Sequence, residues 1–369
     1  MSNKKLSVIA KPTHKCNLKC KYCYIEDYAE NGRMSEQLLA QSIERVSSYI
    51  DTSHWIWHGG EPLLMGVDFF RVTKDIQNFY EKKGKVFSNG IQTNGTLITE
   101  ELLDFVQATH DFDIGTSIDG PKEINDKTRS FPIGGAFDEI IKGINLLKKR
   151  KGSVGAICVV NAYNIKSPEQ IYCFFKSNKI HVKFNPLIKS GRANKNLSEL
   201  EITPKQYGEF LLNMWEIYNL DCIENGVVTI DVDPFMEVIG NVIIGRPLGC
   251  NYSKSCREDF ISIGPEGDIY PCGRFDGVKD FWIGNIKTNT IEQAINSEIN
   301  NRLKKRGLET ITGCNQCNSG DICNSGCMHN AYCAGDVMGK DPYCKSYQML
   351  FKRLNVVVNT EEELKGGED

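Results

Sequence analysis

Short apolar runs alternate with amphipathic runs over the first two-thirds of the chain. Runs typical of strands occur at 6–11, 54–58, 113–118, 154–160 and 181–186, and another ends near 92–93. Helical spacing of apolar residues follows them at about 35–50, 68–82, 137–149 and 205–219, and from Thr99 and Ser167. Six successive strand–helix units predict an α/β fold with a parallel sheet and right-handed crossovers. Because polar, glycine-rich segments follow the strands, we expect a partial (β/α)6 TIM-like barrel rather than a doubly wound sheet.

Several of these helices begin with recognisable capping residues. Ser35 and Thr99 are placed to accept hydrogen bonds from the first turns of their helices. Ser167 with Gln170, and Thr203 with Gln206, have the spacing of a capping box, and a proline follows each cap.

The pattern changes in the last third of the chain. From about residue 236 helical periodicity fades, and a hairpin is predicted around Pro265-Glu266-Gly267-Asp268. The rest is rich in cysteine and loops, and too poor in apolar periodicity to form a core without bound clusters. We therefore expect a barrel over 1–235, a cysteine-rich domain over 236–355, and a frayed acidic tail over 356–369.

Composition excludes several functional classes. The net charge is −3, and lysine and arginine are scattered, which argues against a nucleic-acid partner. The start, MSNKKLSVIAKPTHKC, is too short and too polar to be expected as a signal peptide, and the sequence contains no run of about 18 apolar residues. We expect a cytoplasmic protein with no membrane partner.

Fifteen cysteines are the exceptional feature of the composition. In a reducing compartment, thiols in short-range groups indicate metal ligands rather than a disulfide framework. One group lies at the front of the chain and a larger one fills the last third. Cys158, in a predicted strand, and Cys173, in a predicted helix, are expected to be core residues, whereas Cys222 and Cys333 have no assigned role.

The front group, Cys16, Cys20 and Cys23, lies in a loop directly after the first predicted strand. Three thiolates can hold three irons of a 4Fe–4S cluster and leave the fourth iron open to a small molecule. A structural zinc site is the alternative, but it needs a fourth ligand, and no further cysteine or suitable histidine lies nearby.

With its neighbours, this loop resembles the radical S-adenosylmethionine (radical SAM) superfamily over essentially the whole chain. The matching motifs are KCNLKCKYCY, WHGGEPLL (57–64), Gln92-Thr93-Asn94-Gly95, and GTSIDGP (115–121) with a later arginine. The resemblance implies that S-adenosylmethionine binds on the open iron. It also implies that the cofactor contacts come from Tyr22, Gly59, Gly60, Glu61, Asn94, Ser117, Arg129 and Ile188. For Ser117 a turn cap, and for Arg129 a surface ion pair, remain alternatives.

The resemblance also implies the chemistry. Reductive cleavage of S-adenosylmethionine yields a 5′-deoxyadenosyl radical that abstracts hydrogen from a substrate, while the protein supplies positioning and excludes water. His58 and Asp276 are candidate catalytic residues, although a buried, hydrogen-bonded histidine is an equally good explanation of His58. The resemblance further implies a flavodoxin- or ferredoxin-type electron donor.

The back cysteines resemble the SPASM extension of radical enzymes that modify peptides and proteins. Two auxiliary 4Fe–4S clusters are implied, which makes three clusters in all. The resemblance assigns one to Cys250, Cys256, Cys272 and Cys327, and the other to Cys314, Cys317, Cys323 and Cys344. Two zinc ribbons are the alternative, which the upstream cluster loop argues against.

We expect the substrate to be a ribosomally made precursor peptide or a protein, which gains a thioether or carbon–carbon crosslink or a similar oxidation. We expect no N-terminal peptide-recognition domain, so a leader peptide would bind the barrel or the extension. The alternative is an anaerobic sulfatase-maturating enzyme, which oxidises a cysteine or serine to formylglycine. Those enzymes use an aspartate directly after a cluster cysteine as the base, where this chain has Gly273. A further alternative is a multi-cluster electron carrier without chemistry of its own, but in such a protein the Gly-Gly-Glu-Pro motif would have no function.

Overall fold

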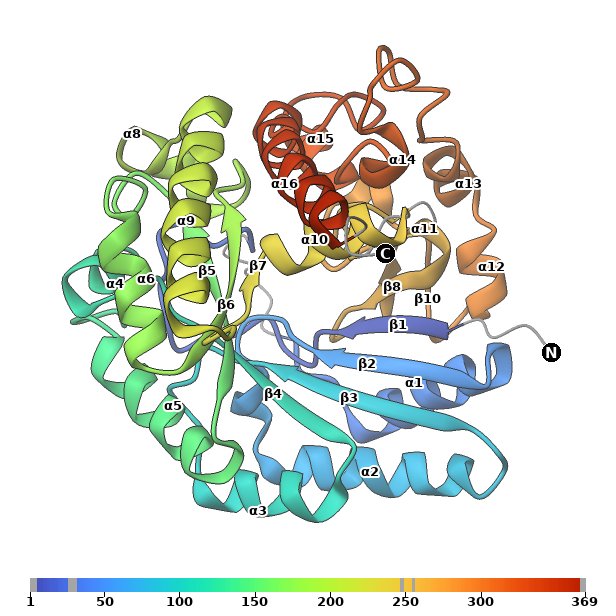
Figure 1. The fold of residues 1–369 in the computed structure, drawn as a ribbon. Helices are drawn as coiled ribbons and strands as arrows, with labels where there is room; N and C mark the ends of the chain where they lie inside the picture. Colours follow the sequence, from blue (N-terminus) through green and yellow to red (C-terminus); the bar gives the residue numbers. More distant parts are fainter. Residues whose placement is uncertain (1–4, 26–31, 246–248, 254–255, 366–369) are drawn as a thin grey trace. The chain divides into compact units, whose positions relative to one another are not determined.

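Strands and helices alternate along the first two-thirds of the chain, as the sequence pattern predicts (Figure 1). The structure is a computed structural model, and it describes residues 5–25, 32–245, 249–253 and 256–365, with side-chain burial described to residue 355. Its contacts divide the chain into two units. Unit 1 comprises Met1–Ser117, Arg129–Val154 and Ser255–Lys305, and unit 2 comprises Ile118–Thr128, Gly155–Lys254 and Arg306–Asp369.

Each unit combines segments that are distant in the sequence. The elements of unit 1 are β1 (Lys5–Ala10), α1 (Glu36–Tyr49), β2 (Thr52–Trp57), η1 (Pro62–Met65), α2 (Val67–Glu81), β3 (Val86–Gln92), α3 (Glu100–Thr109), β4 (Phe112–Ser117), α5 (Phe137–Lys151), α11 (Cys256–Asp259), β8 (Phe260–Ile263), β9 (Asp268–Tyr270), η2 (Lys279–Phe281), β10 (Gly284–Asn285), α12 (Ile291–Ile295) and α13 (Glu298–Lys304). The elements of unit 2 are α4 (Lys122–Thr128), β5 (Val154–Val160), α6 (Pro168–Ser177), β6 (Ile180–Pro186), α7 (Arg192–Lys195), α8 (Leu197–Leu200), α9 (Pro204–Asn225), β7 (Val232–Asp233), α10 (Phe235–Ile244), α14 (Gly320–Cys323), α15 (Met328–Cys333) and α16 (Cys344–Lys365).

The strands of unit 1 form one sheet in the order β10-β9-β8-β1-β2-β3-β4. Strands β1 to β4 pair in parallel, with Val8 opposite Trp55 and Trp55 opposite Asn89. The predicted hairpin is present as β8 and β9, and β8 pairs in parallel with β1. The sheet therefore continues past β1 into the cysteine-rich region.

The core of unit 1 lies between this sheet and helices α1, α2 and α3, which cover one face of strands β1–β4 (Figure 1). Trp55 and Trp57 are fully buried and stack with their ring centroids 5.4 Å apart. Trp57 also meets Phe69 and Phe70 of α2 edge to face. Each such buried side chain contributes about 1.5–3 kcal/mol or more to stability, which fixes the C-terminal ends of the strands relative to one another.

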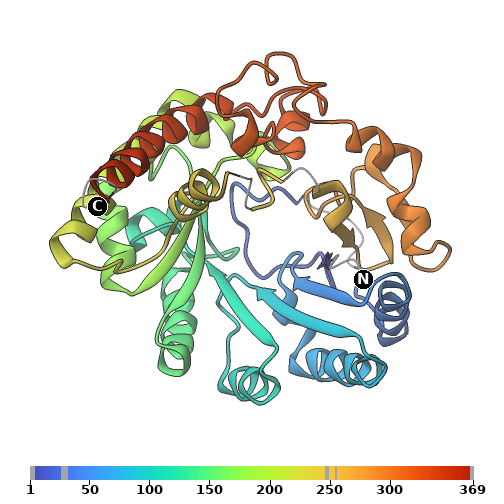
Figure 2. The same ribbon diagram turned by 45° about the vertical axis from the view of Figure 1, so that its right-hand side comes forward.

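Unit 2 has a second sheet segment in the order β5-β6-β7, and β6 and β7 are parallel. The C-terminal helix α16 packs along α9 and α10, and Figure 2 shows its red ribbon beside α9. Tyr207 of α9 contacts the rings of Tyr343 and Tyr347, and the Tyr343 hydroxyl donates to the Leu187 carbonyl at 2.6 Å. The last cysteine segment is thus attached to the end of β6.

Three of the four predicted caps are confirmed. Ser35 and Thr99 accept from the backbone of their first turns, and Thr203 with Gln206 forms the predicted capping box. The capping box predicted at Ser167 is wrong, because Ser167 makes no side-chain cap and Gln170 donates to Glu123 instead.

Other details also differ from the expectations. A regular helix, α10, occupies the start of the segment where periodicity fades, and α16 extends to Lys365, so part of the segment expected as a frayed tail is helical. Residues 366–369 lie outside the described residues. Cys158 is buried as expected, but Cys173 is exposed. On α6 the inward face carries Ile171, Tyr172 and Phe175, and residue 173 points away from it.

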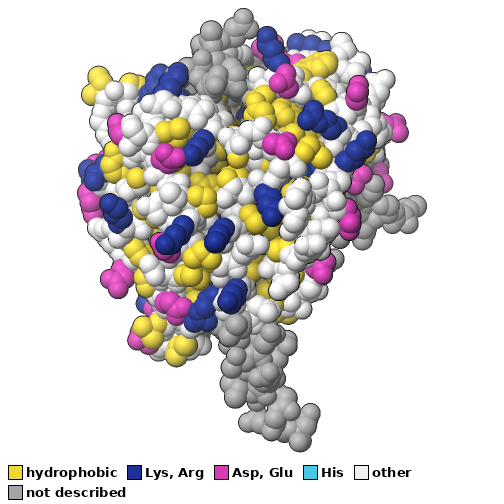
Figure 3. All heavy atoms as spheres, turned by 90° about the horizontal axis from the view of Figure 1, so that it is seen from above, with side chains coloured by type: hydrophobic (Ala, Val, Ile, Leu, Met, Phe, Trp, Pro, Cys, Tyr) yellow, Lys and Arg dark blue, Asp and Glu magenta, His cyan; other side chains and the backbone are white. Residues whose placement is uncertain are grey.

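One face of the molecule shows how the charged side chains are distributed. On the face seen in Figure 3, lysine and arginine side chains are scattered among aspartate and glutamate side chains. Among the helices that the structure describes, none has the length and apolar character needed to cross a bilayer.

Candidate active site

The loop with Cys16, Cys20 and Cys23 follows β1, at the C-terminal edge of the sheet in unit 1. The Cys16 sulfur lies 3.4 Å from the Leu18 amide nitrogen and 3.7 Å from Asn94 Nδ2, two donors that favour a thiolate at this position. Burial outweighs them and raises the pKa of the Cys16 thiol. A bound iron–sulfur cluster would supply the positive charge that deprotonates such thiols.

Gly59 and Gly60 follow β2 and touch the backbone just before this loop. A Cβ on Gly60 would lie 2.1 Å from the Lys15 carbonyl oxygen, and one on Gly59 would lie 2.4 Å from that of Thr13. The Gly60 and Glu61 amides donate to the carbonyls of Thr13 and Lys15 at 3.0 and 2.8 Å. Paired glycines are therefore required here so that two backbone segments can approach each other.

We predict that Gly60→Ala separates these segments, lowers stability by roughly 1–3 kcal/mol and impairs loading of the front cluster. Gly155→Ala is the matched control, because a Cβ at residue 155 meets nothing within 4 Å. Thermal unfolding and iron content measure both effects. Equal behaviour of the two variants would contradict the packing role of Gly60.

Glu61 faces protein groups rather than open space. Its Oε1 accepts from the Leu63 amide at 3.0 Å and from the Thr93 hydroxyl at 2.7 Å, and its Oε2 accepts from the Asn94 amide at 2.8 Å. Burial raises the pKa of Glu61, although these donors oppose the shift. The carboxylate thus joins the turn after β2 to the end of β3.

Polar side chains at the ends of β3 and β4 are joined to the cluster loop or to each other. Asn94 donates to Asn17 Oδ1 at 2.8 Å. Ser117 accepts from Gln92 Nε2 at 3.1 Å. Arg129, which is buried, donates to the Tyr22 hydroxyl at 2.6 Å. The structure therefore brings Tyr22 to Arg129 and Asn94 to the loop that contains Cys16.

His58 directly follows β2 and precedes the paired glycines. Its Nδ1 accepts from the Gly59 amide at 2.7 Å, and its ring lies 6.4 Å from that of Tyr24. Burial, together with the nearby charges of Lys11 and Arg274, lowers the pKa of His58 to about 4, although the hydrogen bond with Gly59 opposes the shift. A neutral imidazole that fixes the Gly59 turn is what this geometry supports.

Asp276 lies in the loop after β9 and meets the segment that follows β1. Its Oδ2 is 3.1 Å from Lys11 Nζ and 3.1 Å from His14 Nε2, and both Asp276 and Lys11 are buried. Burial alone would raise the pKa of Asp276, but Lys11 and His14 outweigh it and hold the pKa below its usual value. The result is an ionised carboxylate that contacts His14, which lies two positions before Cys16 in the sequence.

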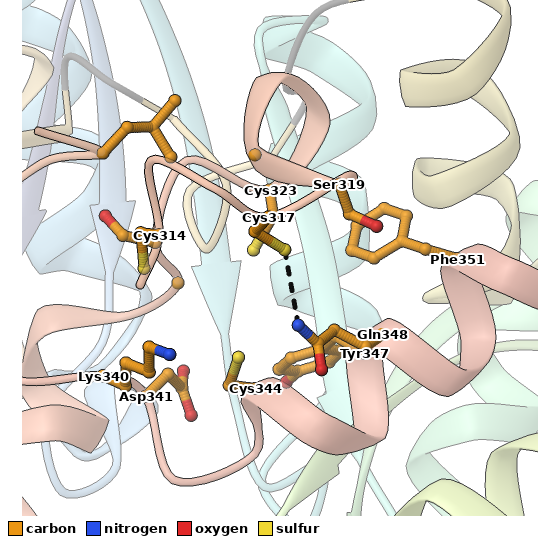
Figure 4. A pocket seen from close by; sticks show the side chains of 14 residues that line it. Cys314, Cys317, Ser319, Cys323, Lys340, Asp341, Cys344, Tyr347, Gln348 and Phe351 are labelled. Atoms are coloured by element: carbon orange, nitrogen blue, oxygen red, sulfur yellow. Dashed lines mark hydrogen bonds between the residues drawn. The ribbon is translucent and has the colours of Figure 1, made fainter. Parts of the chain in front are cut away.

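In unit 2, four of the back cysteines line one pocket, together with Lys340 and Asp341 (Figure 4). These are Cys314, Cys317, Cys323 and Cys344, the set that the resemblance assigns to one auxiliary cluster. Burial raises the pKa of Cys323 to about 12 and also raises those of Cys314 and Cys344, which Lys340 partly offsets. Gln348 Nε2 lies 3.3 Å from the Cys317 sulfur. Four sulfur donors around one pocket are the donor set that a 4Fe–4S cluster requires.

The remaining predicted ligands are distributed over both units. Cys256 and Cys272 belong to unit 1, and Cys250 and Cys327 belong to unit 2, so their assignment to one cluster stays a prediction. Ile188 lines a second pocket of unit 2 with Tyr343 and Cys333. The Cys333 sulfur lies 3.7 Å from His329 Nδ1.

Sequence reasoning missed several residues of these sites. Lys11 and His14 carry no motif, and their partner Asp276 lies 262 positions after His14. Arg306 and Asp341, which hold the backbone around the back cysteines, were likewise not identified. A lone arginine or aspartate in an irregular segment gives no spacing from which a contact can be predicted.

Comparisons with known proteins agree with this geometry. A model of the radical SAM superfamily matches residues 10–175, and a model of an iron–sulfur cluster-binding domain, SPASM, matches residues 255–318. The fold and the site define a radical SAM oxidoreductase with a SPASM extension, whose cofactors are 4Fe–4S clusters and S-adenosylmethionine.

Relatives that match nearly the whole chain indicate which group of radical SAM enzymes it belongs to. The serine-type anaerobic sulfatase-maturating enzyme of Bacteroides thetaiotaomicron is 30% identical over 95% of this chain and 90% of its own. The cysteine-type enzyme of Clostridium perfringens is 28% identical over 94% and 95%. A solved structure, native anSMEcpe with bound AdoMet and Kp18Cys peptide, is 26% identical with a TM-score of 0.84, over 96% of this chain and 99% of that one. The chain therefore belongs to the radical SAM family that contains the anaerobic sulfatase-maturating enzymes.

Proposed function

We propose that this enzyme oxidises a cysteine or serine side chain of a protein or peptide to formylglycine by radical SAM chemistry. The observation that carries the proposal is the extent of the similarity. The sulfatase-maturating relatives match both the cluster loop and the SPASM region, over nine-tenths or more of both chains. A relative of this fold is also known with a peptide and AdoMet bound together.

Peptide crosslinking, our main expectation from the sequence, is less well supported and is the second candidate. The SuiB structure of Streptococcus suis bound to precursor peptide SuiA has a TM-score of 0.67 at 13% identity, which shows a common fold alone. One feature still favours this candidate. A Cβ at Gly273 would lie 2.7 Å from Cγ2 of Ile9 on β1, so this position is closed to the aspartate that sulfatase-maturating enzymes carry.

A proton acceptor must then come from elsewhere in the chain, and we assign it to Asp276. When bound, S-adenosylmethionine and the reduced cluster supply the radical that removes one hydrogen atom from the substrate. Completing the oxidation of a serine also releases one electron, which one of the bound clusters would accept, and the hydroxyl proton. Asp276 is buried and four residues after Cys272, and its Oδ2 lies 3.1 Å from His14 Nε2, which places the carboxylate to receive that proton.

The proposed reaction also requires an electron donor and a suitable cellular compartment. A flavodoxin- or ferredoxin-type protein would deliver single electrons to the clusters. The eleven proposed cluster ligands must remain thiolates, and a reducing compartment protects thiolates from oxidation. We therefore propose a cytoplasmic location.

The experiment compares serine and cysteine versions of candidate substrate peptides, drawn from short reading frames and sulfatases encoded beside this gene. Anaerobically reconstituted enzyme is mixed with S-adenosylmethionine, dithionite and peptide, and products are analysed by mass spectrometry after treatment with a hydrazide. Formylglycine is an aldehyde, so the expected product is a hydrazone at the target residue.

Two outcomes would count against the proposal. A product that has lost two hydrogens but forms no hydrazone would indicate a crosslink. Cluster reduction without formation of 5′-deoxyadenosine would indicate an electron carrier.

A further inference from the structure

Two segments of unit 2 carry three of the proposed auxiliary-cluster ligands. The first, 323–330, includes Cys323 and Cys327, and the second, 337–344, ends at Cys344. By the proposed assignment, Cys323 and Cys344 serve one cluster and Cys327 serves the other. Ligands of both auxiliary clusters therefore share one piece of backbone.

The first segment adopts a costly conformation. Asn324, Ser325 and Gly326 have φ values of 48°, 73° and 71°, so two residues with side chains lie in the left-handed region. Such a conformation persists only where the surrounding structure imposes it. The question is which groups impose it here.

Arg306 is the first such group. Its side chain is buried, and its guanidinium donates to the carbonyls of Ser325 and Gly326 at 2.9 and 2.8 Å. It also donates to the carbonyls of Val337 and Gly339, each at 3.0 Å. One planar group thus joins the two segments at four backbone oxygens, a task for which the rigid fork of arginine is suited and a lysine ammonium is not.

Asp341 joins the same segments through their amides. Its Oδ2 accepts from the Cys327 amide and from Asn330 Nδ2, each at 3.0 Å, and its Oδ1 accepts from the Tyr343 amide at 2.8 Å. A Cβ on Gly326 would lie 2.7 Å from the Asp341 Cβ, so the two segments touch at this point. The carboxylate therefore connects a proposed ligand of one cluster to the residue before a proposed ligand of the other.

We propose that Arg306 and Asp341 are positioning residues that couple the assembly of the two auxiliary clusters. Loading of either cluster orders the two joined segments, and this pre-forms the ligand positions of the other. Because such coupling is reciprocal, losing one cluster weakens the hold on the second. The inference rests on the proposed cysteine assignment, and it does not depend on which substrate the enzyme oxidises.

The test measures iron rather than product. The full-length chain with Cys16, Cys20 and Cys23 replaced by alanine carries only the auxiliary clusters, about eight irons. In this background, Cys317→Ala removes one proposed ligand of the cluster in the four-cysteine pocket. It should also lower the iron occupancy of the other auxiliary cluster. Added Asp341→Asn or Arg306→Lys should break this link, so that the intact cluster keeps its iron when its neighbour is lost.

Release of iron to a chelator gives a second readout. With the background chain alone, we expect a single phase, whereas Asp341→Asn and Arg306→Lys should give two phases, the faster accelerated roughly five- to hundredfold. Arg302→Lys and Asp336→Asn are the matched controls, since both residues are exposed. Circular dichroism of each apo chain detects loss of folding.

Three results would overturn the proposal. One is that the background chain loses its two auxiliary clusters independently of each other. Another is that Asp341→Asn and Arg306→Lys release iron at the same rate as the control variants. The third is unfolding of both apo variants while the controls stay folded, because the pair would then support the fold itself rather than the coupling. Absence of peptide oxidation would bear on the proposed function alone and would leave these iron measurements unchanged.

Discussion

Replacing Cys16, Cys20 and Cys23 together by alanine is expected to abolish cleavage of S-adenosylmethionine while about eight irons remain bound per chain. The three thiols lie in one loop of unit 1, whereas the pocket of four cysteines lies in unit 2, so removal of the first set leaves the second intact. Iron and sulfide analysis of anaerobically reconstituted protein, with chromatography for 5′-deoxyadenosine, measures both parts of the prediction.

Cys173→Ala serves as the control, because Cys173 is exposed on α6 and belongs to none of the three proposed ligand sets. It should retain about twelve irons and full cleavage activity. About twelve irons in the triple variant would contradict the assignment of the front loop, as would any remaining 5′-deoxyadenosine.

Asp276→Asn is expected to lower peptide oxidation by about 10²-fold or more, while cleavage of S-adenosylmethionine continues. The amide keeps the size of the side chain but cannot take up a proton at neutral pH. Cleavage without matching product is the informative result, because loss of a merely structural contact would reduce both together. Parallel assays of 5′-deoxyadenosine and of modified peptide give this ratio directly.

Loss of the charge also leaves Lys11 without its carboxylate partner, so stability must be measured alongside. Asp280→Asn, at an exposed site of the same loop region, should behave like the unaltered enzyme. A fall in iron content or unfolding temperature that accounts for the lost product would make Asp276 a structural residue, and the base would then lie elsewhere.

The parts of the structure that local patterns determine could be predicted from the sequence. Alternating apolar runs predicted the strands and helices of the first two-thirds, and the Thr203–Gln206 spacing predicted a capping box that is present. The cysteine spacing at the front predicts a cluster loop, because the three proposed ligands lie within eight residues. In each case the interacting groups are neighbours in the chain.

Contacts between distant residues could not be predicted in this way. The Ser167 cap failed because Gln170 finds a partner in Glu123, on another helix. The carboxylate of Glu61 accepts hydrogen bonds from Thr93 and Asn94, more than thirty residues later, and no local spacing predicts these contacts. Division of the chain into two interleaved units depends on similar contacts, for which a single sequence contains no signal.

Pairing of β8 with β1 has a consequence for biosynthesis. Ser7 lies opposite Phe260, so the strand that leads into the front cluster loop lacks one neighbour until most of the chain has left the ribosome. During that interval β1 presents an open edge, the kind of surface at which nascent chains associate wrongly. Metal insertion into the front loop would therefore best follow completion of translation, when the SPASM region has returned to close that edge.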